Sequence, residues 1–140
     1  MRRHISDVSA QVAANSSGVR QLNELVDRYS LSMVRACMER IQQAASQKMR
    51  MSLSGITDGV YSRVDYLDDG SPISVRVSIS GDRASVDFTG TGPVLASNLN
   101  ANKAIVTAAV MYSFRCLINE DIPLNSGVLE PIEIVLPECL

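Results

Sequence analysis

The stretch DFTGTGPVLASNLNANKA, from Asp87 to Ala104, is rich in side chains that donate or accept hydrogen bonds. Polar side chains on a loop held by a rigid scaffold are typical of binding and catalytic sites. Donors fixed in such a loop can stabilise the charge that develops in a transition state. The residues of this stretch that we single out as catalytic candidates are Asp87, Thr89, Thr91, Asn98 and Asn100.

A phosphate-binding loop is the first alternative for this stretch. Gly90 and Gly92 have the GxG spacing, but the third glycine of a dinucleotide fingerprint is absent, and no lysine closes the loop as in a P-loop. Pro93 also removes a backbone donor. The strand before the loop is expected in an antiparallel meander rather than in a βαβ unit. We therefore expect no nucleotide site in this loop alone.

An ordinary strand exit is the second alternative. The two glycines permit positive φ, and the threonine hydroxyls can bond nearby backbone groups. Asn98, Asn100 or Asn102 can cap the helix that follows. These residue types fit a turn as well as an active loop, so the sequence leaves both interpretations open.

Three further polar residues are weaker candidates, and each has a structural alternative. Arg115 lies on a predicted helix, where an arginine commonly forms a surface ion pair. Asp121 and Asn125 flank Pro123 in a polar loop, where both residue types commonly build turns.

Two helices are predicted before these elements. Apolar residues recur at helical spacing from Asp7 to about Tyr29 and again from about Ser30 to Leu53, so we expect an αα-hairpin with a short join. Ser30 or Ser32 is a suitable N-cap for the second helix. The apolar stripes are Val8, Val12, Val19, Leu22 and Val26 in the first helix, and Leu31, Val34, Met38, Ile41, Ala45 and Met49 in the second.

Strands follow, because the apolar period changes to two. We predict strands at about 60–67, 73–79 and 84–88, joined by the turns DDGS and SGDR as an antiparallel meander. The alternating residues expected on its inner face are Ile73, Val75, Val77 and Ile79, and then Ala84, Val86 and Phe88. A helix is predicted from about Ala101 to Leu117, and a last strand over EPIEIVL. The order predicts an α+β fold. The residues expected on the buried side of that helix are Ile105, Ala108, Ala109, Tyr112, Cys116 and Leu117.

Composition excludes several classes of protein. The formal charge of −2 gives no electrostatic case for nucleic-acid binding. No apolar run approaches the length of about 18 residues that spans a bilayer. Three widely spaced cysteines (Cys37, Cys116 and Cys139) indicate free thiols in a reducing cytoplasm. His4 is the only histidine, so this chain cannot supply a multi-histidine metal site.

Three segments carry a resemblance to a known family. DVSAQVAANSSGVRQLNELVDRYS is similar to a helix of the pattern DLxAQxAAxxxGxxxLxxLxxxYG, and GVYSRVDYLDDG to GxYxxxDxLDDDG. With DFTGTGP and NLNANKAIVTAAVMYSFRCLINEDIPLNSGVLEPIEIVLPE, nearly the whole chain resembles the hydantoinase B/5-oxoprolinase family. That family includes N-methylhydantoinase B subunits, the C-terminal half of 5-oxoprolinase and the α subunit of acetone carboxylase.

This sequence departs from the family pattern at two places. The family pattern commonly continues after GT with Asp and then Pro-Gln, where this chain has Gly92 and the residues that follow it. The family also commonly has a cysteine after NxG, where this chain has Val128, which puts a thiol role at that position in doubt.

The resemblance implies a function. Residues 1–140 would be a single fragment of a larger hydantoinase B-like domain, with a helical hairpin over 1–55 and a mixed β/α part over 56–140. It would act in the ATP-dependent hydrolytic opening of a cyclic amide of the hydantoin or 5-oxoproline class and be inactive alone. The implied partner is a hydantoinase A-like ATP-binding subunit or domain. ATP and a divalent metal are implied for the full assembly, with no cofactor or metal site in this chain.

Two other interpretations remain. The chain could be a non-catalytic module for subunit assembly, which the long N-terminal helices favour, or part of an acetone carboxylase-like α subunit. We also expect a homo-oligomer, because a segment of a larger fold exposes apolar surface that seeks partners.

Overall fold

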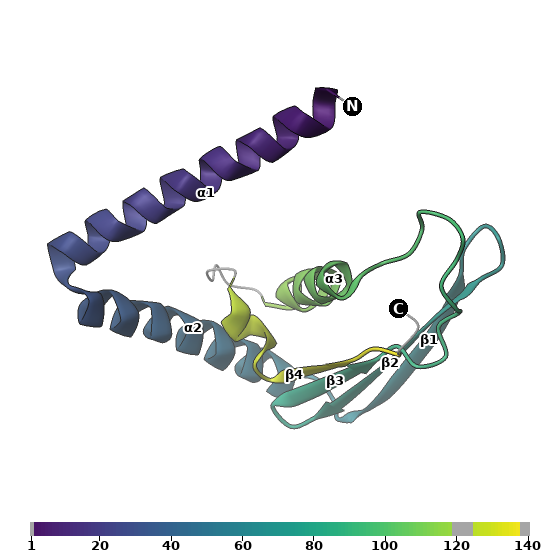
Figure 1. Ribbon diagram of the computed structural model, residues 1–140. Helices are drawn as coiled ribbons and strands as arrows, with labels where there is room; N and C mark the ends of the chain where they lie inside the picture. The colour runs from purple at the N-terminus through teal and green to yellow at the C-terminus, as the bar shows by residue number, and fades with distance from the viewer. Residues whose placement is uncertain (1, 119–124, 138–140) are drawn as a thin grey trace. The chain divides into compact units, whose positions relative to one another are not determined.

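The computed structural model describes residues 2–118 and 125–137 (Figure 1). The chain divides into two compact units, Met1–Arg40 and Ile41–Leu140. The elements in chain order are α1 (Arg2–Tyr29), α2 (Leu31–Ser54), β1 (Gly59–Tyr66), β2 (Pro72–Ser80), β3 (Arg83–Asp87), α3 (Lys103–Arg115), the 3-10 helix η1 (Ser126–Leu129) and β4 (Ile132–Val135). The predicted α+β class is confirmed.

The first unit contains α1 and the beginning of α2, and the predicted helical hairpin is confirmed. Ser30 makes the join. Its φ of 74° turns the chain out of α1, and its hydroxyl accepts a hydrogen bond from the amide of Met33 at 3.5 Å. Ser30, rather than Ser32, is therefore the cap of α2. The predicted apolar stripe of α1 is largely exposed, from 45% at Leu22 to 62% at Val19.

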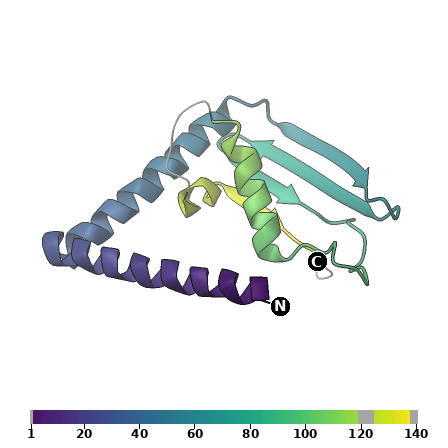
Figure 2. The same cartoon turned by 90° about the horizontal axis from the view of Figure 1, so that it is seen from above.

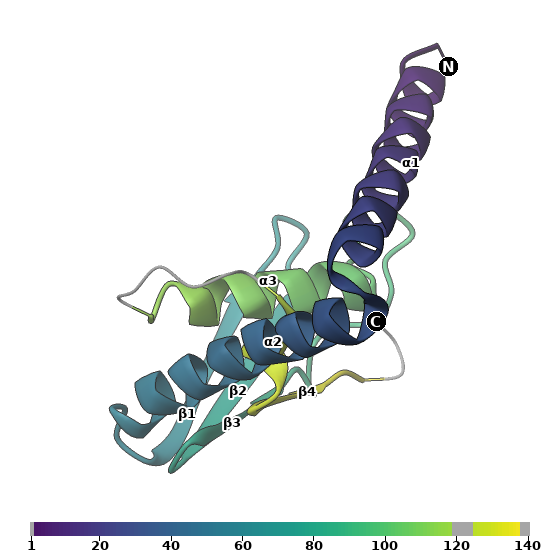
Figure 3. The ribbon, with the colours of Figure 1, turned by 90° about the vertical axis from the view of Figure 1, so that its left-hand side faces the viewer.

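The second unit is built on one mixed sheet with the strand order β1-β2-β3-β4 (Figure 3). β1, β2 and β3 form the predicted antiparallel meander. β4 pairs with β3 in the parallel sense, with Ala84 opposite Ile132. Parallel neighbours need a crossover connection, and α3 supplies it. The expectation that the strand before the loop belongs to no βαβ unit was therefore wrong. That strand, β3, is both the last strand of the antiparallel meander and the first strand of a β3-α3-β4 unit.

Helices cover one face of this sheet (Figure 2). The core joins the second half of α2 and α3 to the inner residues of the strands. The buried apolar residues are Ala45, Met49 and Leu53 of α2, Ile79, Ala84, Val86 and Ile132 of the strands, and Val106, Val110 and Phe114 of α3, together with Ile118 and Val128. The predicted inward positions Ala45, Met49, Ile79, Ala84 and Val86 are confirmed.

The predicted buried side of α3 was wrong. Ile105 is 56% exposed and Tyr112 is 71% exposed, whereas Val106, Val110 and Phe114 are buried. Neighbouring helical residues differ by about 100° around the axis, so an error of one position selects a different face. The helix is apolar on several sides, and the sequence pattern therefore did not select one face.

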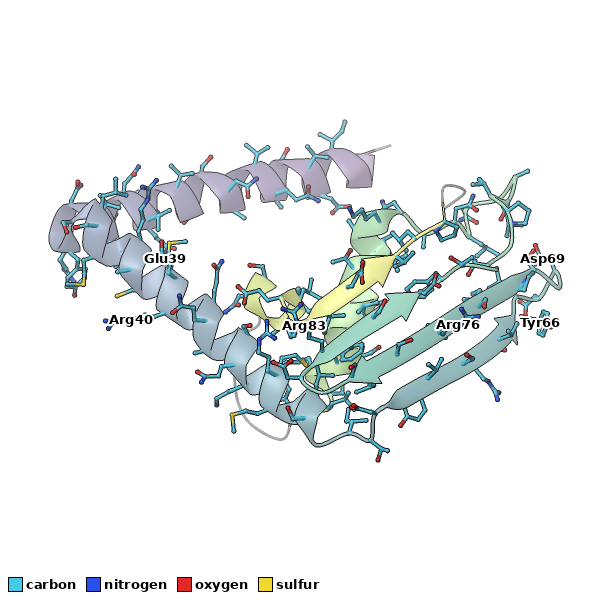
Figure 4. All side chains as sticks on the ribbon, turned by 90° about the horizontal axis from the view of Figure 1, so that it is seen from below. Glu39, Arg40, Tyr66, Asp69, Arg76 and Arg83 are labelled. Carbon is cyan, nitrogen blue, oxygen red and sulfur yellow. The ribbon has the colours of Figure 1, made fainter. Side chains whose placement is uncertain are left out.

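The other face of the sheet is uncovered in the described chain (Figure 4). It carries Arg76 and Arg83, both exposed, and the serines that alternate with the inward residues of β2. An ion pair at one end of the sheet joins Arg50 of α2 to Asp82 of the β2–β3 turn, with Nη1 and Oδ2 2.9 Å apart.

Candidate functional site at the exit of β3

The polar stretch found in the sequence forms the connection from β3 to α3. It therefore begins at the carboxyl end of a strand that has a parallel neighbour. In parallel sheets with crossover helices, ligands commonly bind beyond the carboxyl ends of the strands. The connection from β3 to α3 is therefore the candidate site. Its hydrogen bonds determine which of its side chains are free to contact a ligand.

Asp87, the last residue of β3, bonds to Thr89 in a tight local turn. Its Oδ1 accepts a hydrogen bond from the Thr89 amide at 2.8 Å. Hydrogen bonds from the Thr89 side chain and backbone lower the pKa of Asp87 below its usual value, and the charge of Arg76 acts in the same direction. Arg76 lies directly opposite Asp87 on β2. Asp87 is therefore held as a carboxylate.

Thr91 fastens the loop to β2. Its hydroxyl accepts a hydrogen bond from the Ser74 amide and donates one to the Ser74 carbonyl, both at 3.1 Å. The Gly92 amide continues this contact by donating to the Pro72 carbonyl at 2.8 Å. Gly90 makes the preceding bend with a φ of 96°, which favours glycine. The hydroxyl of Thr91 thus makes the two backbone hydrogen bonds with Ser74 that a neighbouring strand would otherwise make.

These contacts bear on phosphate binding. A phosphate cradle needs backbone amides that point freely at the ligand. Here the amides of Thr89, Thr91 and Gly92 donate to Asp87, Phe88 and Pro72. These three amides are therefore not free to bind a phosphate.

Asn100 and Asn102 have separate structural roles. The Asn100 amide bonds both the N–H and the carbonyl of Leu95 at 2.8 Å and the carbonyl of Ser97 at 3.0 Å, which closes the loop on itself. Asn102 is the N-cap of α3, and its Oδ1 accepts from the Ile105 amide at 3.0 Å. Asn98 is exposed and makes no hydrogen bond with any residue that the structure describes.

A small apolar pocket lies beneath the loop. Its volume is about 120 Å³, and Thr91 and Asn100 are among the polar residues of its wall. The apolar part of the wall comes from the ends of the strands, the loop and α3, and includes Leu67, Ile73, Phe88, Leu95, Leu99 and Val106. The loop therefore combines an apolar hollow with polar groups, as small-molecule sites do, but the hollow is smaller than the about 300–1,000 Å³ of such sites.

The weaker candidates lie elsewhere. Arg115 is the last residue of α3, 13 residues long, so the helix separates it from the loop by about 18 Å at 1.5 Å per residue. Asn125 caps η1 through a 2.8 Å hydrogen bond from the Gly127 amide and also reaches the Ile41 carbonyl of α2 at 3.4 Å. Asp121 lies outside the described residues. Of the five main candidates, Thr91 and Asn100 share the wall of one pocket. Asp87 lies opposite Arg76 at the end of β3 and is not part of that wall.

The contact of η1 with α2 is a feature that sequence reasoning missed. A Cβ on Gly127 would overlap the backbone of Gln42, so only glycine fits there. Gln42 also donates to the Ser126 hydroxyl at 3.1 Å. Val128, at the position where a cysteine is common in the resembling family, is fully buried. The NSG sequence gives a turn signal, but nothing in it identifies the helix that it contacts.

Metal-binding groups and membrane spans are absent from the described part of the chain. No group of three or more His, Cys, Asp or Glu side chains among residues 5–118 and 125–137 could hold a metal ion, so no metal-dependent step is assigned to them. Cys37 and Cys116 are free and exposed. Within the same ranges no helix has the length and apolar character to cross a bilayer.

Comparisons with known proteins agree along the whole chain. The model of the family described as Hydantoinase B/oxoprolinase matches residues 1–140. 5-Oxoprolinase 1 of Arabidopsis thaliana is 41% identical over 96% of this chain and 12% of its own length. The putative B subunit of a D-/L-hydantoinase from Pseudomonas sp. (strain NS671) is 29% identical over 96% of this chain and 26% of its own length.

A solved structure has the same fold. The ATP-dependent caprolactamase from Pseudomonas jessenii matches with a TM-score of 0.81 and 31% identity, over 94% of this chain and 24% of that one. The chain thus spans about an eighth of the length of the plant 5-oxoprolinase and about a quarter of the Pseudomonas hydantoinase protein and of the caprolactamase chain. With a family model that covers every residue, the chain belongs to the Hydantoinase B/oxoprolinase family.

Proposed function

We propose that this chain is a segment of a subunit that opens cyclic amides, of the hydantoin or 5-oxoproline class, in an ATP-dependent reaction. The observation that carries the proposal is the 41% identity to a 5-oxoprolinase over 96% of the chain. The likeness to an ATP-dependent caprolactamase supports it, because a lactam is also a cyclic amide.

The chemistry divides between two parts of the assembly. An amide is a poor electrophile, and phosphorylation of its oxygen provides a leaving group. We assign this ATP-dependent step, with its divalent metal, to a hydantoinase A-like subunit or domain. Two observations support the assignment: the amides of Thr89, Thr91 and Gly92 are already bonded, and the described residues hold no group of three metal-binding side chains. The hydantoinase B-like part then receives the activated amide. One water adds to the carbon and the ring C–N bond breaks, which leaves an acyl phosphate and a free amine. A second water then releases phosphate and leaves the carboxylate.

The loop from β3 to α3 is the part of this chain that we propose for the second step. Asp87, Thr89 and Asn98 offer polar side chains at or near its surface, and the Asp87 carboxylate can orient a water molecule by accepting its hydrogen bond. Thr91 and Asn100 are positioning residues, because their hydrogen bonds fix the loop backbone. A loop held in this way keeps its polar groups in one geometry, as catalysis by preorganised groups requires.

Subunit assembly is the second candidate function. The exposed apolar side chains within residues 1–40 favour it, because such surfaces often bind other proteins. Leu22, Met33 and Met38 are among those about half exposed or more. This role is compatible with the first one, since one protein can carry both. A carboxylase of the acetone carboxylase type remains the third candidate, in which the substrate would be a ketone and the reaction a carboxylation.

A chimeric enzyme tests the proposal. The segment of Arabidopsis 5-oxoprolinase 1 that matches this chain is replaced by residues 1–140, and ATP-dependent opening of 5-oxoproline is measured. We expect turnover. A chimera that folds and binds ATP but opens no cyclic amide would refute the proposed function.

A further inference from the structure

The pocket beneath the loop from β3 to α3 suits only the apolar part of a ligand. Among the described residues of its wall, three have polar side chains, Ser71, Thr91 and Asn100. The Thr91 hydroxyl donates to the backbone of β2, and the Asn100 amide group donates to two carbonyls of the loop. Hydrogen bonds from the backbone and side chain of Ser71 lower the pKa of Asp69, so this hydroxyl is engaged as well. A carbonyl or carboxylate oxygen placed in the pocket would therefore find no side-chain donor, and a polar group buried without a partner is unfavourable.

The size of the pocket matches one small ring. Its volume is about 120 Å³, and a cavity of about 150 Å³ with an apolar wall can hold a benzene ring. Ile73, Phe88 and Val106 contribute apolar side chains to the wall from β2, from the residue after β3 and from α3. The pocket therefore has room for the carbon edge of a small ring and is too small for a drug-sized ligand.

The place of the pocket connects it with the proposed reaction. The loop above it begins at the carboxyl end of β3, the side of a β-α-β unit on which ligands commonly bind. Two residues of the wall, Leu99 and Asn100, directly follow the exposed residue Asn98, which we propose for the reaction. A cyclic amide has a polar edge, the amide, and an apolar edge of CH₂ groups. A ligand held by the apolar edge would keep its amide outside the pocket.

We propose that this pocket is the ring subsite of the enzyme: it receives the CH₂ edge of the cyclic amide and limits the size of the ring. The inference rests on the proposed function, because it concerns the substrate of the same loop. Leu99 and Ala101, which both belong to the wall, are then residues that determine specificity and take no part in the bond-breaking steps.

Filling the pocket tests the subsite in the chimera with Arabidopsis 5-oxoprolinase 1. Ala101→Leu adds three carbon atoms at the wall and should raise the KM for 5-oxoproline about tenfold or more, with a smaller change in kcat, because an apolar pocket discriminates a single CH₂ group by about 10–200-fold. Ala96→Leu makes the same change at an exposed position of the loop outside the wall and should leave the KM unchanged. An unchanged KM in an Ala101→Leu chimera with a normal melting temperature would overturn the proposal, and an apolar side chain from the rest of the longer protein would then be the occupant.

Enlarging the pocket tests the limit on ring size and does not depend on how Ala101→Leu folds. Leu99 is 59% exposed, so Leu99→Ala widens the pocket without removing a core side chain. The ratio of kcat/KM for 6-oxopiperidine-2-carboxylate, whose ring has one more CH₂ group, to kcat/KM for 5-oxoproline should rise about tenfold. Val94→Ala truncates an equally exposed apolar side chain of the loop outside the wall and should leave this ratio unchanged. A ratio that Leu99→Ala does not change would refute the limit.

Ligand binding without turnover separates this inference from the proposed function. 2-Pyrrolidinone, the unsubstituted five-membered lactam, is added to the 140-residue chain, and methyl resonances are followed by NMR. We expect shifts at Leu99, Ala101 and Val106, no shift at Ala96, and loss of the shifts in Ala101→Leu. If these shifts occur but the chimera opens no cyclic amide, the proposed function fails and lactam binding in the pocket stands. Absence of the shifts would overturn the subsite even if the chimera is active.

Discussion

The carboxylate of Asp87 and the backbone amide of Thr89 form a 2.8 Å hydrogen bond at the point where β3 ends. Hydrogen bonds from the Thr89 side chain and backbone lower the pKa of Asp87, with a further contribution from the charge of Arg76 on the neighbouring strand. Thr89 thus closes the strand and keeps the charge of the residue that we propose for water orientation.

This relationship predicts a pH dependence. A folded-state pKa below the ordinary value of 3.8 means that the ionised group contributes stability above that pH, and that this contribution is lost as the pH falls through the folded-state pKa. Asp87→Asn should lower the melting temperature at pH 6, and its difference from the unmodified chain should shrink as the pH falls below 3.8. Asp68→Asn, in the β1–β2 turn, is the control. A difference that is constant with pH would contradict the argument.

Thr91 gives a second prediction. Thr91→Val keeps the shape but leaves the N–H and carbonyl of Ser74 without their bonds to the hydroxyl. We expect a loss of about 1–3 kcal/mol in the free energy of unfolding and faster amide hydrogen exchange at Ser74. Thr91→Ser retains the hydroxyl and should keep the Ser74 amide protected. Equal protection in both variants would show that the hydroxyl does not hold the loop.

The contact between η1 and α2 gives a third prediction. Gly127→Ala places a methyl group against the Gln42 backbone and should destabilise the chain by about 1–3 kcal/mol or more. Gly18→Ala is the matched control, because nothing lies within 4 Å of its Cβ position on α1. It should stabilise the helix by about 0.5–1 kcal/mol. Denaturant unfolding measures both changes, and a Gly127→Ala chain as stable as the unmodified one would refute the close approach.

The isolated chain should be inactive. We expect neither ATPase nor cyclic-amide hydrolase activity, because the loop amides that a phosphate would need are already bonded within the chain. Purified chain is assayed across a size-exclusion profile. Turnover that follows the protein peak would contradict the division of the chemistry between two parts.

The sequence predicted those parts of the fold that the local spacing of apolar residues determines. Alternating residues in β2 and β3 identified the meander and its inner face, because only one face is apolar. The same reasoning failed on α3, where Ile105 and Val106 are equally apolar and neighbours in sequence. Local pattern also gave no pairing partner for β4, so its parallel direction could not be predicted.

The candidate site was predicted as a segment but not as a geometry. Three asparagines had equal claims to cap α3, and the structure gives that role to Asn102 and a loop-closing role to Asn100. The bond from Thr91 to Ser74 joins residues 17 positions apart. Such a contact depends on strand register, which a single polar residue does not reveal.

Asn98 now carries the sharpest test of the proposed function. It has no hydrogen bond with the described residues, so Asn98→Ala should leave the melting temperature of the 5-oxoprolinase chimera almost unchanged. Asn102→Ala makes the same chemical change four residues later, at the N-cap of α3, and should cost about 1 kcal/mol of folding free energy. The two variants therefore separate stability from catalysis.

The decisive measurement is the rate of ATP-dependent ring opening by these two chimeras at saturating 5-oxoproline. If the loop acts on the activated amide, Asn98→Ala should reduce kcat by about a hundredfold, the usual effect of losing one preorganised donor, while Asn102→Ala stays near the unmodified rate below its melting temperature. A rate for Asn98→Ala within about threefold of the unmodified chimera, less than about 1 kcal/mol, would contradict the assignment of this loop to the reaction.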